Sequence, residues 1–307
     1  MLSAQTASSP KELLQQLATA VLDKERALRL VVAALLGDGH VLLEDLPGVG
    51  KTTLALALAR SLGLAFVRVQ MTSDLLPGDI LGGTTFDPNA RQFVFRPGPI
   101  FHSVVLVDEI NRASPRAQSA LLEAMAEGQV SLDGQTYPLP DPFFVIATQN
   151  PMEHQGVFPL PESQLDRFSI ILSLGYPSAA AEARLLAGEL ARVEGLAPVA
   201  DAVTVQVWRQ AVGQVFLSAE IRQMLLDLAH RSRSDGRIRL GLSPRGLLAL
   251  RRMVQAWAFL DGRDFVEPGD LRAVTLPVLA HRLLLREPGS AAQMAVTLMQ
   301  ECWGFGP

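Results

Sequence analysis

The sequence predicts an α/β fold with a five-stranded, mainly parallel sheet, followed by an all-helical domain. Two observations lead to this prediction. In the first part of the chain, short apolar runs alternate with helical patterns, as in parallel sheets that helices cover on both faces. After residue 176 the strand-like runs stop and helical patterns continue alone. We therefore expect an α/β core over residues 1–176 and a helical domain over residues 177–307.

The core begins with a helix and then alternates strands with helices. Ser9 is the predicted N-cap of the first helix, Pro10 follows it, and the helical pattern continues to Leu36. A second helix follows the glycine-rich loop after the first strand, and a third begins at Ser114. The predicted strands cover residues 40–44, 65–70, 103–109, 143–148 and 168–174.

Two segments interrupt this alternation. Residues 71–100 are rich in glycine and proline and lie between β-like pieces. Residues 129–142 contain an Asp-Gly pair between two short strands, which is typical of a hairpin. Both segments are predicted to be insertions at the edge of the sheet, and long insertions often serve a function.

The second domain shows only helical periodicity. We find no internal repeat in it, so an array of identical units is not expected. Its predicted helices cover residues 179–192, 203–213, 218–233, 245–260 and 268–285.

Composition bounds the class of protein. The chain has 307 residues, of which 49% are hydrophobic, and its formal net charge is −4. This charge argues against a protein that coats DNA or a membrane surface, because such proteins need a basic field. The single cysteine, Cys302, excludes an internal disulfide framework and fits a reducing compartment. We find neither a membrane-spanning run nor a signal peptide, and we expect a cytoplasmic protein.

The stretch VLLEDLPGVGKTTLALALA at residues 41–59 is close to the phosphate-binding pattern G-x-x-x-x-G-K-[ST], with Asp45 at the position of the first glycine. Backbone N–H groups of such a loop, and of the helix after it, point at phosphate oxygens. Glycine lets the backbone come close to them. The residues predicted to bind a nucleotide are Pro47, Gly48, Val49, Gly50, Lys51, Thr52 and Thr53.

Three residues of this stretch have distinct predicted roles. Lys51 would reach the outer phosphates, and the Thr52 hydroxyl would ligate Mg²⁺. Aspartate tolerates turn geometry better than most residues other than glycine, so Asp45 should shape the entry to the loop. Its carboxylate should point away from the phosphates, because like charges repel. The alternative is a glycine-rich turn that contains a lysine by chance.

Two acids end the third predicted strand. Asp108 and Glu109 end the run VVLVDE, which is apolar enough to be buried on both faces. They should lie at the carboxyl edge of the sheet, beside the glycine-rich loop. Asp108 can hold Mg²⁺ through its water shell, and Glu109 can polarise a water for attack on the γ-phosphate. The alternative is a pair of solubilising acids at a strand end.

Three further polar residues are candidates for the same site. Asn150 follows the strand FFVIAT and could hold the attacking water or, alternatively, only form a turn before proline. Arg167 could complete a neighbouring subunit's site as an arginine finger, or form a surface ion pair with Asp166. Arg245, at a helix start in the second domain, could fold over bound phosphates or only begin that helix.

Seven phrases in one order resemble AAA+ ATPases of the MoxR family. The resemblance runs from about residue 10 to residue 303, nearly the whole chain. The glycine-lysine-threonine loop alone is weak support, whereas the ordered set is highly specific. The phrases are LLEDLPGVGKTTLA, TSDLLPGDILG, FRPGPIF, VDEINRASPRAQSALLEAMAEGQVS, FFVIATQNP, LPESQLDRF and SPRGLLAL.

The resemblance implies a P-loop AAA+ core with an all-α lid domain after it. Residues 71–100 and 129–142 match the family's helix-2 insert and pre-sensor-1 hairpin. By this resemblance the Walker A residues are Lys51 and Thr52, the Walker B residues are Asp108 and Glu109, sensor 1 is Asn150, the arginine finger is Arg167 and sensor 2 is Arg245.

Members of this family typically form hexameric rings and act as chaperone-like ATPases that use ATP and Mg²⁺. They often work with proteins that carry a von Willebrand factor A domain, in maturing enzymes or inserting metals. Ring assembly would bring Arg167 to a neighbour's phosphates. Gln70, at the end of the second strand, could pair with Glu109 and hold it inactive until a partner binds.

Two other functions stay open from the sequence. One is a DNA-acting ring motor or loader, but the basic stretch RSRSDGRIR at residues 231–239 has no aromatic residues for base stacking. Nucleic acid is therefore not the expected partner. The other is a nucleotide-controlled scaffold with little turnover, against which the full set of acids, asparagine and arginine argues.

Overall fold

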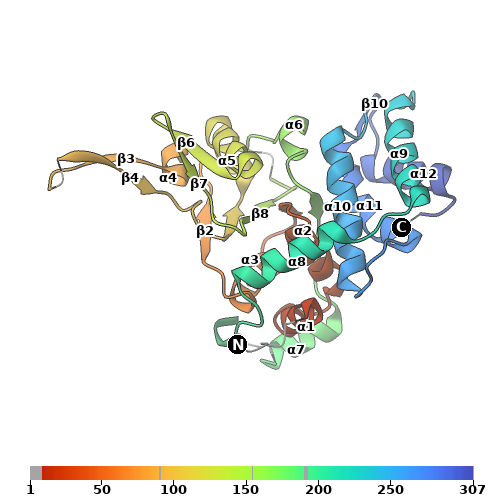
Figure 1. Cartoon of the computed structure of the whole chain (residues 1–307), viewed down its shortest axis with the longest axis horizontal. Coiled ribbons are helices and arrows are strands. Elements are labelled where there is room, and N and C mark those ends of the chain that lie inside the picture. The colour runs from red at the N-terminus through yellow and green to blue at the C-terminus, as the bar shows by residue number, and fades with distance from the viewer. Residues whose placement is uncertain (1–8, 90, 154, 190–192, 307) are drawn as a thin grey trace.

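The computed structural model describes residues 9–89, 91–153, 155–189 and 193–306. Its first part is a parallel sheet between two layers of helices, and further helices pack beside it (Figure 1). The arrangement confirms the predicted α/β fold with a five-stranded parallel sheet. In order across the sheet, the strands are β2 (Phe66–Gln70), β5 (Val104–Asp108), β8 (Phe144–Gln149), β1 (Val41–Glu44) and β9 (Ile170–Leu172).

Alternation along the strands builds two apolar layers. In β1, Leu43 belongs to one buried cluster and Leu42 to the other, because successive side chains of a strand point to opposite faces. The cluster around Leu43 is covered by α1 (Pro10–Ala20), α2 (Glu25–Leu36) and α3 (Lys51–Ser61). The cluster around Leu42 is covered by α4 (Pro77–Leu81) and α5 (Pro115–Glu127).

The first helical run is broken, contrary to the prediction of one pattern from Ser9 to Leu36. α1 ends at Ala20 and α2 begins at Glu25. Between them Asp23 has a left-handed backbone with φ of 54°, which a continuous right-handed helix cannot contain. Ser9 caps α1 as predicted, with its hydroxyl accepting from the Lys11 N–H.

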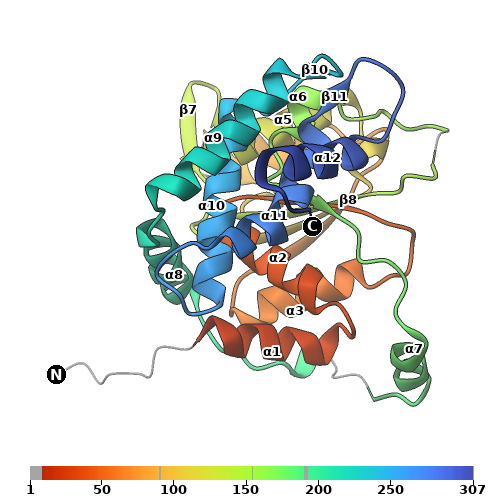
Figure 2. The same ribbon diagram turned by 90° about the vertical axis from the view of Figure 1, so that its right-hand side faces the viewer.

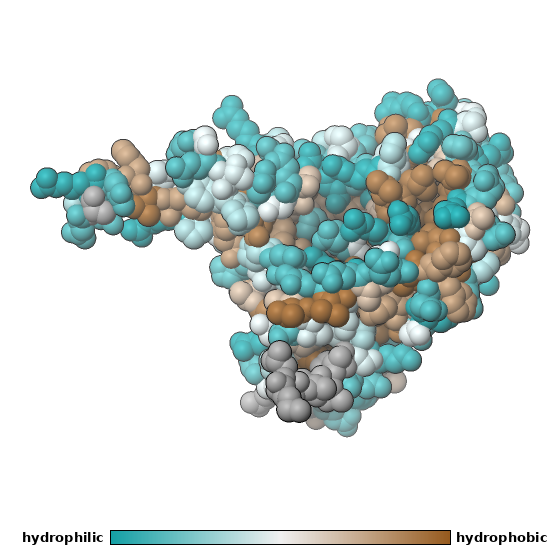
Figure 3. Space-filling view, in the orientation of Figure 1, coloured by the Kyte–Doolittle hydropathy of each residue, from teal (hydrophilic) through white to brown (hydrophobic). Residues whose placement is uncertain are grey.

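The two insertions form hairpins. β3 (Gly82–Asp87) and β4 (Gln92–Pro97) project from the body at the left of Figure 1, and Figure 3 shows brown, hydrophobic surface on this arm. Its segment also contains α4, which the sequence analysis did not predict. β6 (Gln129–Leu132) and β7 (Gln135–Pro138) form the predicted second hairpin. Asp133 and Gly134 make its turn with positive φ at both positions, as a two-residue hairpin turn requires.

The part after residue 176 is mainly helical, as predicted. α7 ends before the predicted residue 192, because Gly188 turns the chain with a φ of 72°; residues 190–192 of that predicted helix lie outside the described residues. The helices here are α7 (Ala179–Leu186), α8 (Ala202–Gln214), α9 (Ala219–Ser234), α10 (Pro244–Leu260), α11 (Pro268–Leu279) and α12 (Ala291–Trp303). Figure 2 shows α9, α10 and α12 together from the side.

Three features of this part were not predicted. α12 was missed. β10 (Ile238–Leu240) pairs with β11 (Leu284–Leu285), so one short antiparallel pair accompanies the helices. The helix predicted to reach residue 285 ends at Leu279, because Arg282 in the following turn donates to carbonyls and a carboxylate of residues 166–169. The remaining short elements are η1 (Ile110–Arg112), α6 (Glu162–Leu165), η2 (Val193–Gly195) and η3 (Ala280–Arg282).

The core and the helical part share one apolar cluster, in which α2 packs against α10. We propose a division between residues 176 and 177, in the connection from β9 to α7. Within the described ranges, no helix combines the length and the apolar character that crossing a bilayer requires.

Candidate nucleotide site

The loop between β1 and α3 has the backbone geometry of a phosphate cradle. Gly48 and Gly50 have φ of 83° and 95°, a region that side chains disfavour. A Cβ on either glycine would meet no atom within 4 Å, so the space in front of the loop is free. Thr52 and Thr53 lie in the first turn of α3, whose N–H groups lack intrahelical partners and suit an anion.

Lys51 lies folded against this loop. Its Nζ donates to the carbonyl oxygens of Asp45 at 2.9 Å and Leu46 at 3.1 Å. Val49, by contrast, is buried in the apolar cluster. The predicted nucleotide contact of Val49 is therefore limited to its backbone, because its side chain packs into the core.

A cavity of about 360 Å³ brings the predicted residues together from three strand ends. The loop follows β1, the acids end β5, and Asn150 follows β8, so all of them meet at the carboxyl edge of the sheet. The cavity has the size of an ordinary small-molecule site. Its lining residues are Pro47, Gly48, Gly50, Lys51, Thr52, Thr53, Arg68, Gln70, Asp108, Glu109, Thr148 and Asn150.

Both oxygens of the Asp108 carboxylate have partners. The Thr148 hydroxyl donates to Oδ1 at 2.6 Å, and it accepts from the Glu109 N–H at 3.0 Å. Arg68 donates to Oδ2 through Nε at 3.0 Å and Nη2 at 2.6 Å. One threonine thus aligns both acids, while the arginine neutralises the first.

Glu109 is held by two side chains. Gln70 Nε2 donates to its Oε2 at 2.7 Å, the contact that the sequence analysis proposed, and Arg112 Nη1 donates to the same oxygen at 3.1 Å. The bond to Glu109 raises the pKa of the Arg112 guanidinium, which stays charged. Glu109 itself has a left-handed backbone with φ of 57°, a conformation that non-glycine residues adopt mainly where the surroundings demand it.

Asn150 both shapes a turn and lines the cavity. Its Oδ1 accepts from the Met152 N–H at 3.1 Å, which is the turn-forming contact that the sequence left open. Asn150 nevertheless lines the cavity, and β8, which precedes it, lies between β5, which carries the acids, and β1, which precedes the loop. The two interpretations of this residue are therefore compatible.

Asp45 points away from the cavity, as predicted. It is buried, and its Oδ1 accepts from the Ser173 hydroxyl at 2.6 Å and the Gly175 N–H at 3.0 Å, while Oδ2 accepts from the Leu174 N–H at 2.5 Å. The carboxylate thereby ties the start of the loop to the connection that leads toward α7.

Arg167 and Arg245 do not line the cavity around Lys51. Both line a second cavity of about 200 Å³ that also contains His40, which precedes β1. Since the loop follows β1, the length of this strand separates the two cavities. Arg167 Nη1 donates to the Leu122 carbonyl at 2.6 Å. Its alternative partner, Asp166, is bound by Arg282.

Four arginines line the second cavity, and two of them are paired with acids: Arg282 with Asp166 and Arg252 with Asp38. Arg167 and Arg245 form no ion pair with a carboxylate of the described residues. Asp166, the nearest acid in sequence, accepts from Arg282 Nε at 2.7 Å and from the Ser243 hydroxyl at 2.8 Å. His40 also lines this cavity; burial lowers its pKa to about 4, so it is neutral near pH 7. The guanidiniums of Arg167 and Arg245 are therefore left without a carboxylate partner among the described residues.

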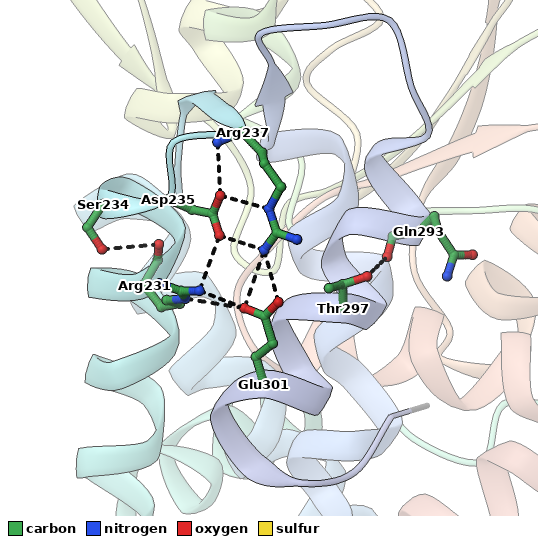
Figure 4. Close-up of polar contacts among 7 residues, drawn as sticks. All are labelled: Arg231, Ser234, Asp235, Arg237, Gln293, Thr297 and Glu301. Carbon is green, nitrogen blue, oxygen red and sulfur yellow. Dashed lines mark hydrogen bonds and ion pairs between the residues drawn. The ribbon is translucent and has the colours of Figure 1, made fainter.

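Two of the four arginines in the basic stretch at residues 231–239 are paired with acids of the chain (Figure 4). Arg237 donates to Asp235 at 2.7 Å and to Glu301 at 3.0 Å, and Arg231 donates to Glu301 at 2.9 Å. The bond from Arg237 holds the pKa of Asp235 at about 2. Arg231 of α9 and Arg237, in the turn after α9, thus bind α12 through Glu301.

The donor set fits Mg²⁺ bound together with a nucleotide. The Thr52 hydroxyl and the Asp108 carboxylate are hard oxygen donors in one cavity. No group of three or more His, Cys, Asp or Glu side chains among the described residues could cage a metal alone. Mg²⁺ commonly takes one or two protein oxygens and completes its shell with phosphates and water.

Arg68, Thr148 and Arg112 are site residues that sequence reasoning missed. Arg68 lies two positions before Gln70, on the same face of β2. Thr148, in β8, lies two positions before Asn150, which follows that strand. Strand alternation could therefore have found the first two. Arg112 lies in η1, three positions after Glu109, so the i,i+3 spacing of a helical turn relates these two residues.

Sequence comparisons find related proteins along most of the chain. The profile of the "ATPase family associated with various cellular activities (AAA)" matches residues 40–170, and an AAA lid domain profile matches residues 230–302. YeaC of Bacillus subtilis is 46% identical over 258 residues, which cover 83% of this chain and 81% of YeaC. Chaperone MoxR1 of Mycobacterium tuberculosis is 37% identical over 280 residues, 86% of this chain and 73% of that protein.

A solved structure agrees with these sequence matches. The crystal structure of a candidate ATPase from Cytophaga hutchinsonii superposes with a TM-score of 0.86 at 32% sequence identity. The match covers 95% of this chain and 93% of the other, so it includes both the sheet and the helical part.

Proposed function

Because the chain belongs to the MoxR family of AAA+ ATPases, we propose that it hydrolyses Mg²⁺-bound ATP in the cavity around Lys51 and uses this reaction to remodel protein complexes. The observation that carries the proposal is the convergence of the glycine-rich loop, two acids and an asparagine at one cavity. This convergence supports a nucleotide site that also holds the groups needed to break the γ-phosphate bond.

Phosphate binding would fall to the loop and Lys51. Lys51 now bonds two loop carbonyls, and it would turn from them to the β- and γ-phosphates. Thr52 and Asp108 would hold Mg²⁺, directly and through water respectively. When bound, the metal ion supplies positive charge to the phosphate oxygens.

Hydrolysis would depend on Glu109 and Asn150. Glu109 would take a proton from the attacking water, and Asn150 would orient that water. In the present arrangement Gln70 and Arg112 occupy Glu109 Oε2, so this oxygen must be released before it can act. This requirement supports the hypothesis that Gln70 holds the enzyme at a low rate until a partner binds.

A complete site would need a second copy of the chain. Arg167 and Arg245 lie beyond the length of β1 from the loop, so neither reaches the chain's own phosphates in this arrangement. We propose that they act on the nucleotide of a neighbour in a hexameric ring. A ring gives every cavity a neighbour's arginines, because the same head-to-tail contact repeats until it closes.

The substrate of the remodelling would be a protein. A relative is named a chaperone, and the resemblance to the MoxR family adds a partner with a von Willebrand factor A domain. The maturation of enzymes or insertion of metals is the process in which such a pair would act. We propose a cytoplasmic location, which agrees with a single cysteine. Nucleic acid is not part of the proposal, because Arg231 and Arg237 are paired with acids.

Glu109→Gln is the direct test of hydrolysis. The variant should bind ATP as the unmodified protein does but lose about a hundredfold or more in kcat, because an amide cannot take the proton. Equilibrium binding of ATP and steady-state phosphate release measure the two effects. Lys51→Ala is the matched control, since it should lose binding as well as turnover.

The same pair of variants tests the client. With ATP present, Glu109→Gln should retain protein clients in a pull-down that Lys51→Ala does not retain. Turnover by Glu109→Gln at the unmodified rate would refute the catalytic assignment. Turnover near zero in the unmodified, assembled protein with its partner would favour the scaffold function.

A further inference from the structure

Arg68 is the second cation in the nucleotide cavity, beside Lys51. It lies on β2, the edge strand of the sheet, and its side chain is 50% exposed. Two of its nitrogens converge on one oxygen of Asp108, Nε at 3.0 Å and Nη2 at 2.6 Å. Asp108 is only 13% exposed, so the flexible partner of this pair is the arginine.

Strand alternation gives Arg68 and Gln70 parallel positions. Both side chains leave the same face of β2, and each binds one of the two acids: Arg68 binds Asp108, and Gln70 binds Glu109. Arg68 Nη2 also donates to Gln70 Oε1 at 3.3 Å. The edge strand thus holds both acids of the site through one connected set of contacts.

We propose that Arg68 is a displaceable internal counter-ion, which occupies the Asp108 carboxylate in the nucleotide-free protein and leaves it when Mg²⁺ arrives with ATP. The inference rests on the proposed Mg²⁺–ATP function of this cavity. The Thr148 hydroxyl keeps Asp108 Oδ1, so the oxygen under competition is Oδ2. A guanidinium on this oxygen would repel a divalent cation whose bound water binds there, and the half-exposed arginine can move into solvent.

The alternative is that Arg68 only orients Asp108 for the metal. The two roles predict opposite effects of removing the guanidinium. If Arg68 competes with Mg²⁺, its loss makes the carboxylate easier to reach and less Mg²⁺ is needed. If Arg68 positions the carboxylate, its loss leaves the ligand less well ordered and more Mg²⁺ is needed.

The test is a Mg²⁺ titration of binding, read by the fluorescence of a labelled, non-hydrolysable ATP analogue. In Arg68→Gln the half-saturating Mg²⁺ concentration should fall about fivefold, the scale of an exposed ion pair. Arg68→Lys keeps the charge without the two-nitrogen contact and should lie between. In EDTA the affinity of Arg68→Gln for the analogue should not rise, because a positive charge has left the phosphate cavity.

Arg112→Gln is the matched control. Arg112 is also 50% exposed and pairs with the neighbouring Glu109, so its removal takes one positive charge from beside the cavity without touching Asp108. Its half-saturating Mg²⁺ should change by less than about twofold, since the remaining effect is screened. An equal fall in both variants would assign the effect to net charge and overturn the inference.

Other outcomes separate this inference from the proposed function. A half-saturating Mg²⁺ concentration for Arg68→Gln that equals or exceeds the unmodified value overturns the counter-ion role alone. Binding by the unmodified protein that ignores Mg²⁺ overturns the proposed function and the inference with it. If Arg68→Gln folds poorly, as its melting temperature would show, the sign of the shift in Arg68→Lys decides the question.

Discussion

The two cavities of the chain differ in how their charges are satisfied. Around Lys51, each acid has a cation: Asp108 has Arg68, and Glu109 has Arg112. Around Arg167 and Arg245, the nearby acid Asp166 is taken by Arg282, and the two arginines keep their charge free. The acids of the first cavity are therefore paired within the chain, whereas Arg167 and Arg245 have no carboxylate partner among the described residues.

The buried ion pair between Arg282 and Asp166 explains why Asp166 is not available to Arg167. Arg282 is 2% exposed, and burial lowers its pKa while Asp166 opposes that shift, so the buried pair needs both partners. Ser243, the N-cap of α10, donates to the same aspartate. The Asp166 carboxylate thus fixes the start of the helix that carries Arg245, and it is withheld from Arg167.

The largest effect should come from removing Arg167, because this residue of the second cavity is proposed to complete the nucleotide site of a neighbouring subunit. Arg167→Ala should bind ATP normally but lose about a thousandfold in turnover, the scale of an arginine finger. Steady-state phosphate release and analogue binding measure the two quantities. Arg60→Ala, which alters an exposed arginine in the last turn of α3, is the control and should keep its activity.

Mixing Arg167→Ala subunits with Lys51→Ala subunits tests whether the first cavity of one subunit works with the second cavity of its neighbour. Arg167→Ala subunits retain Lys51, and Lys51→Ala subunits retain Arg167, so an equal random mixture should restore about a quarter of the sites in a head-to-tail ring. No recovery on mixing, in a sample that has assembled, would contradict action on a neighbour's nucleotide.

A smaller effect is expected inside the first cavity, from the contact that holds Glu109. Gln70→Ala removes one hydrogen bond to its Oε2 and should raise the basal rate of ATP hydrolysis about threefold. Thr84→Ala, which removes a hydrogen bond between the two hairpins, is a matched loss elsewhere. Basal and partner-stimulated rates of Gln70→Ala that both match the unmodified protein would eliminate the gating hypothesis.

The smallest effect on nucleotide binding should come from Asp45, the acid that faces away from the first cavity. Asp45→Gly loses hydrogen bonds to residues 173–175 and should lower the free energy of unfolding by about 1–3 kcal/mol. Its ATP affinity should stay within about twofold of the unmodified value, because the carboxylate lies outside the phosphate space. Denaturant melts and binding titrations measure both quantities.

Asp227→Asn is the control for that stability change. Asp227 is an exposed acid of α9 that accepts one hydrogen bond, from Gln223, and its replacement should cost less than about 0.5 kcal/mol. A large gain in ATP affinity in Asp45→Gly would show that the aspartate tunes the phosphate site after all.

Much of the first cavity could be predicted from the sequence. Short apolar strands have a period that can be read locally, and in a parallel sheet their carboxyl ends must meet at one edge. The sequence therefore indicated that Lys51, Asp108, Glu109 and Asn150 would converge, and one cavity contains them. It also indicated the Asp-Gly hairpin, whose turn depends on adjacent residues only.

The contacts of the second cavity, and those of the connection from β9 to α7, could not be predicted in this way. The local pattern predicted a helix to residue 285, but α11 ends at Leu279, before Arg282. The partners of Arg282 lie more than a hundred positions away in the sequence, so the local pattern could not reveal them. The partners of Asp45 at residues 173–175 are equally distant. No local period encodes such contacts.

The fold class, the glycine-rich loop and the two acids at the end of β5 follow from the amino-acid sequence alone, since each depends on neighbouring residues and on strand polarity. The pairing of the charged side chains, in contrast, depends on how distant segments pack. This packing put Arg68 on Asp108, gave Asp166 to Arg282 and separated Arg167 from Lys51 by the length of a strand. These pairings arise when distant segments are packed side by side, and there burial and distance, rather than order along the chain, select the partner.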